Sequence, residues 1–399
     1  MDVAIIGKGT AAIVTTLHLL KNNHRVTIFY DPKTEPINVG ESSTPPFVDL
    51  IYDTLQISMH DLVNEGIFSY KSGINFVNWG SGKQFYHNFY NQKTSVHFET
   101  KSFNEYIHKF LESNNLVKYV GKKIDEFQYD YSEWKVIVTE GLKYDFVVCC
   151  SGWGNDGYEK PIIETVNSGI LFKKSYEEYS NHHTLHLATE DGWQFGLPFP
   201  KQDTFKCGYL YNNKLISKEK VIEKVSSMEG SEIYDSFSWT PKYSTTMIKN
   251  FFLATNGNRL FFFEPLQALS LHYFIDLAEK ICNFLDNRSE YEMDRINSVY
   301  RSAMYEKQMT LAYHYHFGSS YDSEYWNKIK EKSTQLMEGS YWGLETKFYM
   351  KVNNDIKYNL KADLSSSKLG IFEWQDHKYI INGMIPDSNI LYKSGCKSC

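Results

Sequence analysis

Hydrophobic and polar positions in the first 31 residues follow a strand pattern, then a helical pattern, then a strand pattern again. Residues 2–6 form a short apolar run, residues 11–22 carry apolar side chains at helical spacing, and residues 26–31 form a second β-type run. The apolar face of the helical segment includes Val14, Leu17 and Leu20. The pattern therefore predicts a strand–turn–helix–strand unit about 30 residues long, which is the context that a dinucleotide-binding fingerprint requires.

The turn of this unit carries the small residues that such a fingerprint needs. Gly7 permits a tight turn, Gly9 lets the backbone approach a pyrophosphate, and Ala12 takes the third glycine position, where helix packs on strand. The helix start also offers N–H groups and the positive end of a dipole to phosphate groups. The residues predicted to bind phosphate are Gly7, Gly9, Thr10, Ala11 and Ala12.

Two further positions extend the predicted nucleotide site. Asp31 lies 19 positions after Ala12 and is the candidate for the ribose hydroxyls, although Tyr30 stands where an acidic residue is also expected. Residues 144–149 form another apolar run, and Gly152 follows it. A glycine after a buried strand indicates a second close backbone approach, here to the same nucleotide.

A long helical pattern covers residues 288–317, with Ile296, Val299, Tyr300 and Ala303 expected on one face. The chain is longer than the usual single domain, so we expect two lobes. The predicted division is a nucleotide-binding domain over residues 1–285, with inserted strands at about 75–140 and 165–245, and a helical lobe with a tail over residues 286–399.

Composition narrows the class of protein. Hydrophobic residues make up 42% and charged residues 23%, which is ordinary for a globular protein, and the net charge of −6 gives no reason to expect nucleic acid. The N-terminus has no basic signal-peptide region, and no apolar run is long enough to cross a membrane. Aromatic residues reach 16%, which suits both an apolar core and a pocket for flat ligands.

Cysteine and histidine positions favour structural roles over a metal site. Cys149 and Cys150 fall in a predicted buried strand, which suits reduced cytoplasmic thiols, and the terminal Cys396-x-x-Cys399 lacks a second ligand pair. His314 and His316 are two positions apart on a predicted helix, so their side chains diverge. We assign no metal, and His272 and Asp294 also receive structural roles.

Five segments, in this order along residues 1 to about 330, resemble motifs of the flavin-dependent halogenases, particularly the tryptophan-halogenase branch. They are Gly40-Glu41-Ser42-Ser43-Thr44-Pro45, the segment from Tyr70 to Trp79 with Lys71, Trp193-Gln194-Phe195-Gly196-Leu197-Pro198, Glu264-Pro265-Leu266-Gln267, and His314-Tyr315 followed by Tyr321 to Trp326. The resemblance implies an α/β fold. Its FAD-binding domain would be Rossmann-like, of the glutathione-reductase/p-hydroxybenzoate-hydroxylase type, with a mixed sheet and a largely helical C-terminal substrate lobe.

The resemblance also implies the reactants and the partners. FAD, supplied in reduced form as FADH2 by a separate flavin reductase, would use O2 to oxidise a halide ion to hypohalous acid, which is relayed to Lys71 beside a small aromatic substrate. This chain has no second dinucleotide fingerprint of its own. Because of the net charge and the lack of a long apolar run, nucleic acid and membrane are not expected as partners. A homo-oligomer is left open. The further residues implied for FAD binding are Gly40, Glu41, Ser42, Thr44, Gly152, Gly257 and Asn258.

The resemblance implies that Lys71 is the catalytic residue. Burial would lower its pKa and make a neutral amine accessible near pH 7. Its ammonium form would instead hydrogen-bond the hypohalous acid. Trp193, Phe195 and Pro198 would form a wall between flavin and substrate, and the backbone of Leu269 and Ser270 would hold the halide.

The sequence departs from the family at the predicted halide site. Gln267 stands where the family has an auxiliary glutamate, and an amide cannot take up a proton as a carboxylate does. Ala268 and Leu269 replace a serine and a threonine, and Asn258 replaces an aspartate. We therefore expect bromide or iodide to be favoured over chloride. The alternatives are a flavin monooxygenase that hydroxylates an aromatic substrate and a flavin-binding protein without catalysis.

Overall fold

The computed structural model describes residues 1–34, 40–89, 93–152, 157–176 and 181–338, together with Asp376, Tyr379, Ile380, Gly383 and Met384. The predicted Cys396-x-x-Cys399 tail lies outside the described residues. By contacts the chain forms two compact units. Unit 1 comprises Met1–Lys71, Ser95–Pro161 and Pro241–Ser302, and unit 2 comprises Ser72–Thr94, Ile162–Thr240 and Ala303–Cys399. The predicted division at residue 285 stays a prediction.

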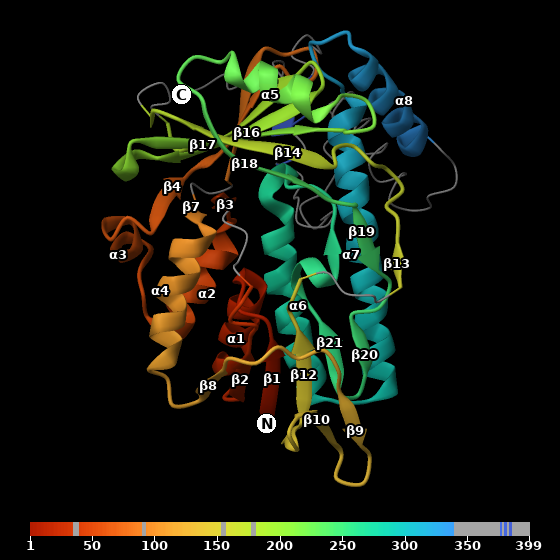
Figure 1. The fold of residues 1–399 in the computed structure, drawn as a ribbon. Coiled ribbons are helices and arrows are strands. Elements are labelled where there is room, and N and C mark those ends of the chain that lie inside the picture. The colour runs from red at the N-terminus through yellow and green to blue at the C-terminus, as the bar shows by residue number, and fades with distance from the viewer. Residues whose placement is uncertain are drawn as a thin grey trace, which may run out of the picture. The chain divides into compact units, whose positions relative to one another are not determined.

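A six-stranded sheet forms the centre of unit 1, in the order β20-β21-β12-β1-β2-β8 (Figure 1). All neighbouring strands are parallel except β20, which is antiparallel to β21. The central strands β1 and β12 are almost continuous apolar runs because both faces of the sheet are covered there. The predicted strands at 2–6, 26–31 and 144–149 are confirmed, with slightly different ends. The bounds are β1 Asp2–Ile6, β2 Arg25–Phe29, β8 Val117–Val120, β12 Phe146–Cys149, β20 Ile248–Asn250 and β21 Leu253–Thr255.

Helices cover one face of this sheet. The predicted first helix is confirmed as α1 (Thr10–Lys21), and ten of its residues are buried because it packs against α2 (Pro45–Leu55), α4 (Thr100–Glu112) and α6 (Leu269–Asp286). The buried hydroxyl groups of Thr15 and Thr16 donate to the carbonyl oxygens of Ala11 and Ala12, so these two polar side chains are satisfied within the helix. Figure 1 shows α1 and α6 beside the central strands.

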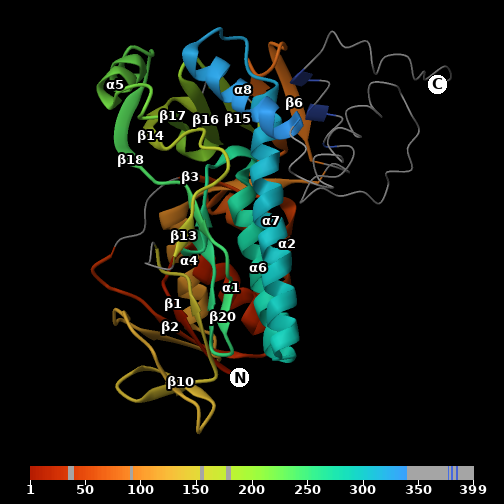
Figure 2. The same cartoon turned by 90° about the vertical axis from the view of Figure 1, so that its right-hand side faces the viewer.

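Antiparallel strands lie on the opposite side of β1 and β2 from α6, as Figure 2 shows for β10. These strands are β9 (Gln128–Asp130), β10 (Lys135–Thr139) and β11 (Leu142–Tyr144). Val136 and Val138 of β10 pack with Phe29 and Phe252 in one apolar cluster. The central sheet is therefore buried on both faces.

A separate three-stranded sheet, β3-β7-β4, carries two of the motif segments. Strand β3 (Gly40–Ser42) and strand β4 (Phe68–Lys71) both pair antiparallel with β7 (Ser95–Glu99). An aromatic cluster underlies this sheet, with Phe47 stacked on Phe98 at 5.1 Å between ring centroids. The remaining elements of unit 1 are α3 Met59–Asn64, β13 Tyr158–Glu159, β19 Lys242–Ser244 and β22 Phe261–Phe262.

Unit 2 contains a seven-stranded sheet in the order β18-β14-β17-β16-β15-β5-β6. It is antiparallel except for the parallel pair β5 and β15, so the predicted mixed sheet is confirmed. Val221 and Val225 of α5 (Lys218–Ser226) pack with Phe172 and Phe205 in an apolar cluster on this sheet. The strands are β5 Gly73–Val77, β6 Gln84–Asn88, β14 Ser168–Lys174, β15 His183–Thr189, β16 Gly192–Phe199, β17 Thr204–Tyr211 and β18 Glu232–Ser238.

The predicted long helix is confirmed as α7 (Glu290–His316), and α8 (Glu324–Glu338) follows it. Ile296 and Tyr300 are buried as expected, but the prediction for Val299 is wrong, since this side chain is 37% exposed. Asn297 is buried in its place. Its side-chain oxygen Oδ1 accepts hydrogen bonds from the backbone N–H groups of Met247 and Ile248. The buried face of α7 therefore includes Asn297 and not Val299.

The described cysteines are all buried, and none of them forms a disulfide with another described residue: Cys149, Cys150, Cys207 and Cys282. His314 is also buried, and its Nδ1 donates to the carbonyl oxygen of Thr310 at 2.7 Å, a packing role as expected.

Among the described residues, no helix is both long and apolar enough to cross a membrane. The same part of the chain contains no group of three or more side chains that could hold a metal ion.

Candidate functional site

The glycine turn after β1 lies against the end of β12. A Cβ on Gly7 would lie 2.8 Å from the backbone of Cys150 and Ser151, and Gly7 has a φ of +120°, so only glycine fits. A Cβ on Gly9 or Gly152 would meet nothing within 4 Å. No described side chain caps α1, and its first turn contains no acidic residue. The turn therefore presents open, electropositive backbone where a phosphate group is predicted.

Side chains from three elements converge on the first residue of α1. The hydroxyl groups of Thr10 and Thr100 both donate to Glu41 Oε1 at 2.9 Å. Burial raises the pKa of Glu41, although the two hydroxyl donors act in the opposite direction. Asn104 of α4 lies beside them, with its Oδ1 3.4 Å from the Thr10 hydroxyl. Asn104 is 4% exposed, and its Nδ2 has no hydrogen-bond partner among the described residues.

His108, one turn further along α4, holds the glycine turn in place. Its Nε2 lies 2.9 Å from the carbonyl oxygen of Lys8, and its Nδ1 lies 2.8 Å from the hydroxyl of Tyr119. Burial lowers the pKa of His108 to about 4, so the ring is neutral at pH 7. Since a carbonyl only accepts, Nε2 carries the proton and Nδ1 accepts from Tyr119.

Of the predicted pair Gly257-Asn258, the glycine lies next to the start of α1. A Cβ on Gly257, which has a φ of +76°, would lie 2.5 Å from the Cβ of Ala11. Asn258 is exposed. The fully buried Asn256 holds this turn, since its Oδ1 accepts from the Gly257 N–H at 2.8 Å and its Nδ2 donates to the Thr15 hydroxyl at 3.1 Å.

Asp31 lies two residues beyond β2, where its carboxylate caps the turn that follows. It accepts hydrogen bonds from the Lys33 N–H at 2.9 Å and from the Thr34 hydroxyl at 3.2 Å. The ammonium group of Lys8 lies 4.7 Å from the centroid of the Tyr30 ring, within the range of a cation–π contact. The aromatic residue that follows β2 thus contacts a basic side chain from the turn after β1.

Lys71 is the last residue of β4, and its side chain is fully buried. The amine Nζ donates to the carbonyl oxygen of Ser43 at 2.9 Å, and the backbone of Lys71 pairs with Ser95 of β7. Burial lowers the pKa of Lys71 from its ordinary value of 10.5 to about 7. Near neutral pH this amine is therefore divided between its charged and neutral forms.

The segment before α6 has an unusual backbone. Gln267 and Ala268 both have left-handed φ angles, 64° and 58°, although neither is glycine. Such a conformation costs about 1–2 kcal/mol per residue. No described side chain caps α6 at Ala268. The left-handed Ala268 followed by the helical Leu269 gives the alternation from which anion-binding nests form.

The family of the chain follows from its sequence matches. The tryptophan halogenase family model matches residues 2–96 and 90–339. The chain belongs to the tryptophan halogenase family. This halogenase is 20% identical over 421 residues to tryptophan 6-halogenase ThaL of Streptomyces albogriseolus, an alignment covering 82% of this chain and 78% of ThaL.

Solved structures share the fold of this halogenase. One is BrvH, a flavin-dependent halogenase from Brevundimonas sp. BAL3, with a TM-score of 0.78 and 14% identity over 96% of this chain and 89% of BrvH. Another is the tryptophan 6-halogenase SttH from Streptomyces toxytricini, with a TM-score of 0.79 and 16% identity over 96% of this chain and 90% of SttH. The predicted family, the Rossmann-like FAD-binding fold and the class of enzyme, an oxidoreductase of the flavin-dependent halogenase type, are confirmed.

The predicted wall residues of the halogenase lie on β16 in unit 2, where they do not share one face. Trp193 contacts Trp79 at 6.2 Å between ring centroids, and alternation along the strand puts Phe195 on the same face. Pro198 lies three positions after Phe195, an odd number, so its side chain is on the opposite face of the strand. Both tryptophans are fully buried, and neither indole N–H has a hydrogen-bond partner among the described residues.

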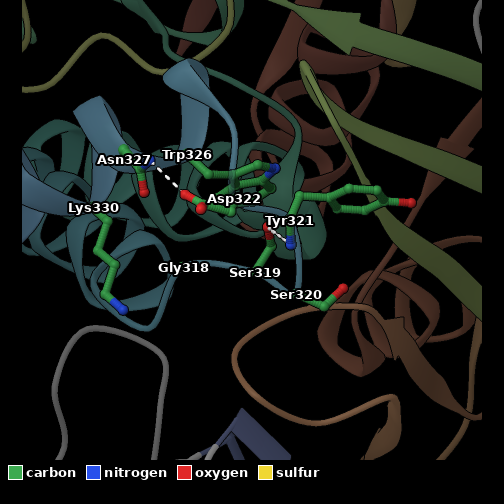
Figure 3. A pocket seen from close by; sticks show the side chains of 8 residues that line it. All are labelled: Gly318, Ser319, Ser320, Tyr321, Asp322, Trp326, Asn327 and Lys330. Carbon is green, nitrogen blue, oxygen red and sulfur yellow. Dashed lines mark hydrogen bonds between the residues drawn. The ribbon is translucent and has the colours of Figure 1, made fainter.

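A shallow pocket of about 220 Å³ lies between the end of α7 and the start of α8 in unit 2 (Figure 3). Its lining residues include Tyr321, Asp322 and Lys330, and Figure 3 shows Asn327 hydrogen-bonded to Asp322. Pockets for drug-sized ligands are usually 300–1,000 Å³. Tyr321, Asp322 and Trp326 of the fifth motif segment line this pocket, but none of the residues predicted to bind FAD or halide or to act in catalysis does, and we assign it no ligand.

Sequence reasoning missed Asn104, His108 and Asn256, and it gave His272 only a structural role. The nearest sequence signal for Asn104 is its place on an amphipathic helix, where a polar residue between Phe103 and Ile107 lies on the buried side. The sequence around His108 and Asn256 gives no comparable signal, because their hydrogen-bond partners are far away in the sequence.

Proposed function

We propose that this enzyme uses reduced FAD, O2 and a halide ion to halogenate a small, electron-rich aromatic substrate, with Lys71 as the residue that activates the halogen. The observation that supports this proposal best is the buried amine of Lys71, whose pKa is lowered to about 7. A separate flavin reductase, acting as a transient cytoplasmic partner, would supply the reduced flavin. Residues beyond about 285 would form the substrate side of the enzyme.

The residues at the glycine turn fit the FAD group. The backbone around Gly9 is open, and α1 begins without a cap or an acidic residue, as a pyrophosphate site requires. The buried Nδ2 of Asn104 is a donor that bound FAD could satisfy. When bound, reduced FAD would supply two electrons to O2, and the reduced oxygen would then oxidise halide to hypohalous acid with release of water. The residues proposed to hold FAD are Gly7, Gly9, Thr10, Ala11, Ala12, Asp31, Gly40, Glu41, Ser42, Thr44, Asn104, Gly152, Gly257 and Asn258.

Asn104→Ala should weaken FAD binding by roughly 10- to 100-fold, since a hydrogen bond to a charged partner contributes about 1.5–3 kcal/mol. Titration of the variant with FAD, followed by flavin fluorescence, measures this change directly. Ser113→Ala, at the exposed end of the same helix, is the matched control and should bind FAD like the wild type. Equal dissociation constants of FAD for Asn104→Ala and wild type would show that Asn104 does not bind FAD.

Lys71 has two chemically sound ways to act. As a neutral amine, its Nζ attacks the halogen of hypohalous acid, so that an N–halogen bond forms, the O–halogen bond breaks, and the departing hydroxide takes a proton from nitrogen to become water. As an ammonium ion, Nζ donates a hydrogen bond to the acid and polarises it for attack by the aromatic ring. A pKa of about 7 makes both forms available at neutral pH.

The halide is proposed to bind at the backbone N–H groups of Leu269 and Ser270, at the start of α6. The left-handed Ala268 and the dipole of an 18-residue helix support an anion there without any particular side chain. Trp193 and Phe195 keep their proposed role of shielding the flavin from the substrate, whereas Pro198 faces the other way.

The direct test is incubation of the full chain with FAD, a flavin reductase, NADH and one halide at a time, over a panel of phenols and indoles. Mass spectrometry should detect a product that has gained a halogen. A product that has gained oxygen would identify a monooxygenase instead. Tight FAD binding with no product under any halide would indicate a flavin-binding protein without catalysis.

Wild-type enzyme should turn over faster with bromide or iodide than with chloride, because Gln267 cannot take up a proton and Ala268 and Leu269 offer no hydroxyl donors. Gln267→Glu should raise chloride turnover several-fold relative to iodide. Steady-state rates with each halide measure both effects, and Gln202→Glu, at an exposed position, is the control. Chloride turnover equal to or above iodide turnover in the wild type would reject this preference.

A further inference from the structure

The hydroxyl of Thr44 makes an unexpected hydrogen bond. Thr44 is the N-cap residue of α2, where a threonine side chain normally accepts a hydrogen bond from the backbone of its own helix. Here no described side chain caps α2. The hydroxyl of Thr44 instead lies 3.1 Å from Nδ1 of His272, 228 residues away in the sequence, and Thr44 is only 7% exposed.

This bond gives little net stability. Loss of an N-cap costs about 1 kcal/mol, and a side-chain hydrogen bond contributes about the same amount. Exchanging one for the other therefore leaves the free energy of unfolding nearly unchanged. A role in positioning explains the exchange better than a role in stability.

Both partners lie beside proposed site residues within unit 1. His272 is in the first turn of α6, three positions after Leu269, where the halide is proposed to bind. Thr44 directly follows Ser43, whose carbonyl oxygen accepts the hydrogen bond from Lys71 Nζ. The contact thus joins the start of α6 to the backbone turn that holds the amine.

Ser43 itself is fixed from the other side by β7. Its hydroxyl lies 2.6 Å from the hydroxyl of Ser95 and donates to the carbonyl oxygen of Val96 at 2.9 Å. Its backbone N–H also donates to the Val96 carbonyl oxygen, at 3.0 Å. With β7 on one side, the bond from Thr44 to His272 ties this turn to α6 on the other.

We infer that His272 is a positioning residue, which through Thr44 holds the turn at residues 43–44 so that the Lys71 amine keeps a fixed place relative to the start of α6. This inference rests on the proposed function, because the amine and the halide site derive their roles from it. It adds a residue that is outside the motif segments and that acts without touching the reacting atoms.

The test combines single variants, their double variant and conservative rescues. Thr44→Val and His272→Phe should each lower the kcat of halogenation about 10-fold, since small displacements at a reacting centre cost up to about 10²-fold. For His272→Phe, which changes no residue proposed to hold FAD, the KM for halide and the rate of flavin oxidation should change less than 2-fold. The double variant should be no worse than either single one. Thr44→Ser and His272→Asn, which keep a hydrogen-bonding group, should restore most of the rate.

Thr54→Val, which makes the same change near the other end of α2, is the matched control and should behave as wild type. A second measurement is independent of turnover: competitive acetylation of Lys71 with acetic anhydride, read by mass spectrometry, should become several-fold faster in His272→Phe than in wild type. Multiplicative losses in the double variant, failed rescue, or unchanged acetylation of Lys71 would overturn the inference. Absence of halogenation by the wild type would overturn the proposed function alone, and acetylation would still decide the positioning role.

Discussion

Replacing Lys71 with methionine is expected to abolish halogenated product while FAD binding and flavin oxidation stay close to wild type. Methionine fills a similar buried volume, so the β3-β7-β4 sheet should keep its packing, but no amine remains to activate the halogen. A positioned acid or base contributes about 10²–10⁴-fold to a rate. The measurement is the ratio of halogenated product to flavin oxidised, with Lys206→Met as control, because burial also lowers the pKa of Lys206. Product from Lys71→Met at more than a tenth of the wild-type rate would contradict the assigned role.

The pH dependence of the wild-type rate distinguishes the two proposed forms of the amine. If the neutral amine reacts, the rate rises as pH increases through about 7, where the folded-state pKa of Lys71 lies. If the ammonium form acts, the rate falls across the same range. In Lys71→Met this titration should be missing from the residual rate.

The same substitution is expected to make the folded protein more stable below pH 7. The pKa of Lys71 is about 7 in the folded chain and 10.5 in an unfolded one. Below pH 7 both states are protonated, and the folded state bears the full cost of a buried charge, on the order of 5 kcal/mol. Between pH 7 and 10.5 the unfolded state holds one more proton, so the stability of the wild type rises with pH. The advantage of Lys71→Met should therefore shrink across this range.

Urea unfolding of both proteins from pH 6 to 9.5 measures this difference. We expect Lys71→Met to be more stable by roughly 2–4 kcal/mol at pH 6, since the Ser43 carbonyl oxygen loses its donor at a cost of about 1–3 kcal/mol. The gap should narrow by about 1.4 kcal/mol per pH unit above 7. A gap that stays constant over the range would show that Lys71 does not titrate with a lowered pKa.

The elements that local pattern determines were predictable from the sequence. The turn from Gly7 to Ala12 and the helix after it follow from a short apolar run, small residues and helical spacing. The long helix α7 was found in the same way, but its buried face was not. Asn297 is buried because it accepts hydrogen bonds from the backbone of Met247 and Ile248, about 50 residues away in the sequence. The spacing of apolar residues within α7 cannot predict that contact.

The contacts that build the candidate site depend on distant pairings. Lys71 is buried because β4 pairs with β7 and because the turn at Ser43 lies over its amine. Asn104 reaches Thr10 across 94 positions, and His272 reaches Thr44 across 228. A residue's own neighbours cannot indicate such partners. The resemblance to a family predicts a role for Lys71, but it predicts none of the residues that surround its amine.

The buried thiols bear on how an enzyme of the proposed kind survives its own chemistry. Hypohalous acid oxidises thiolates most readily, and the thiolate form is scarce when a cysteine pKa is high. Burial raises the pKa of Cys150 and of Cys282 to about 12, and Cys149 and Cys207 are also shielded from solvent. Oxidant that escaped into solution would meet no accessible sulfhydryl group among these four, so self-inactivation would begin at other side chains.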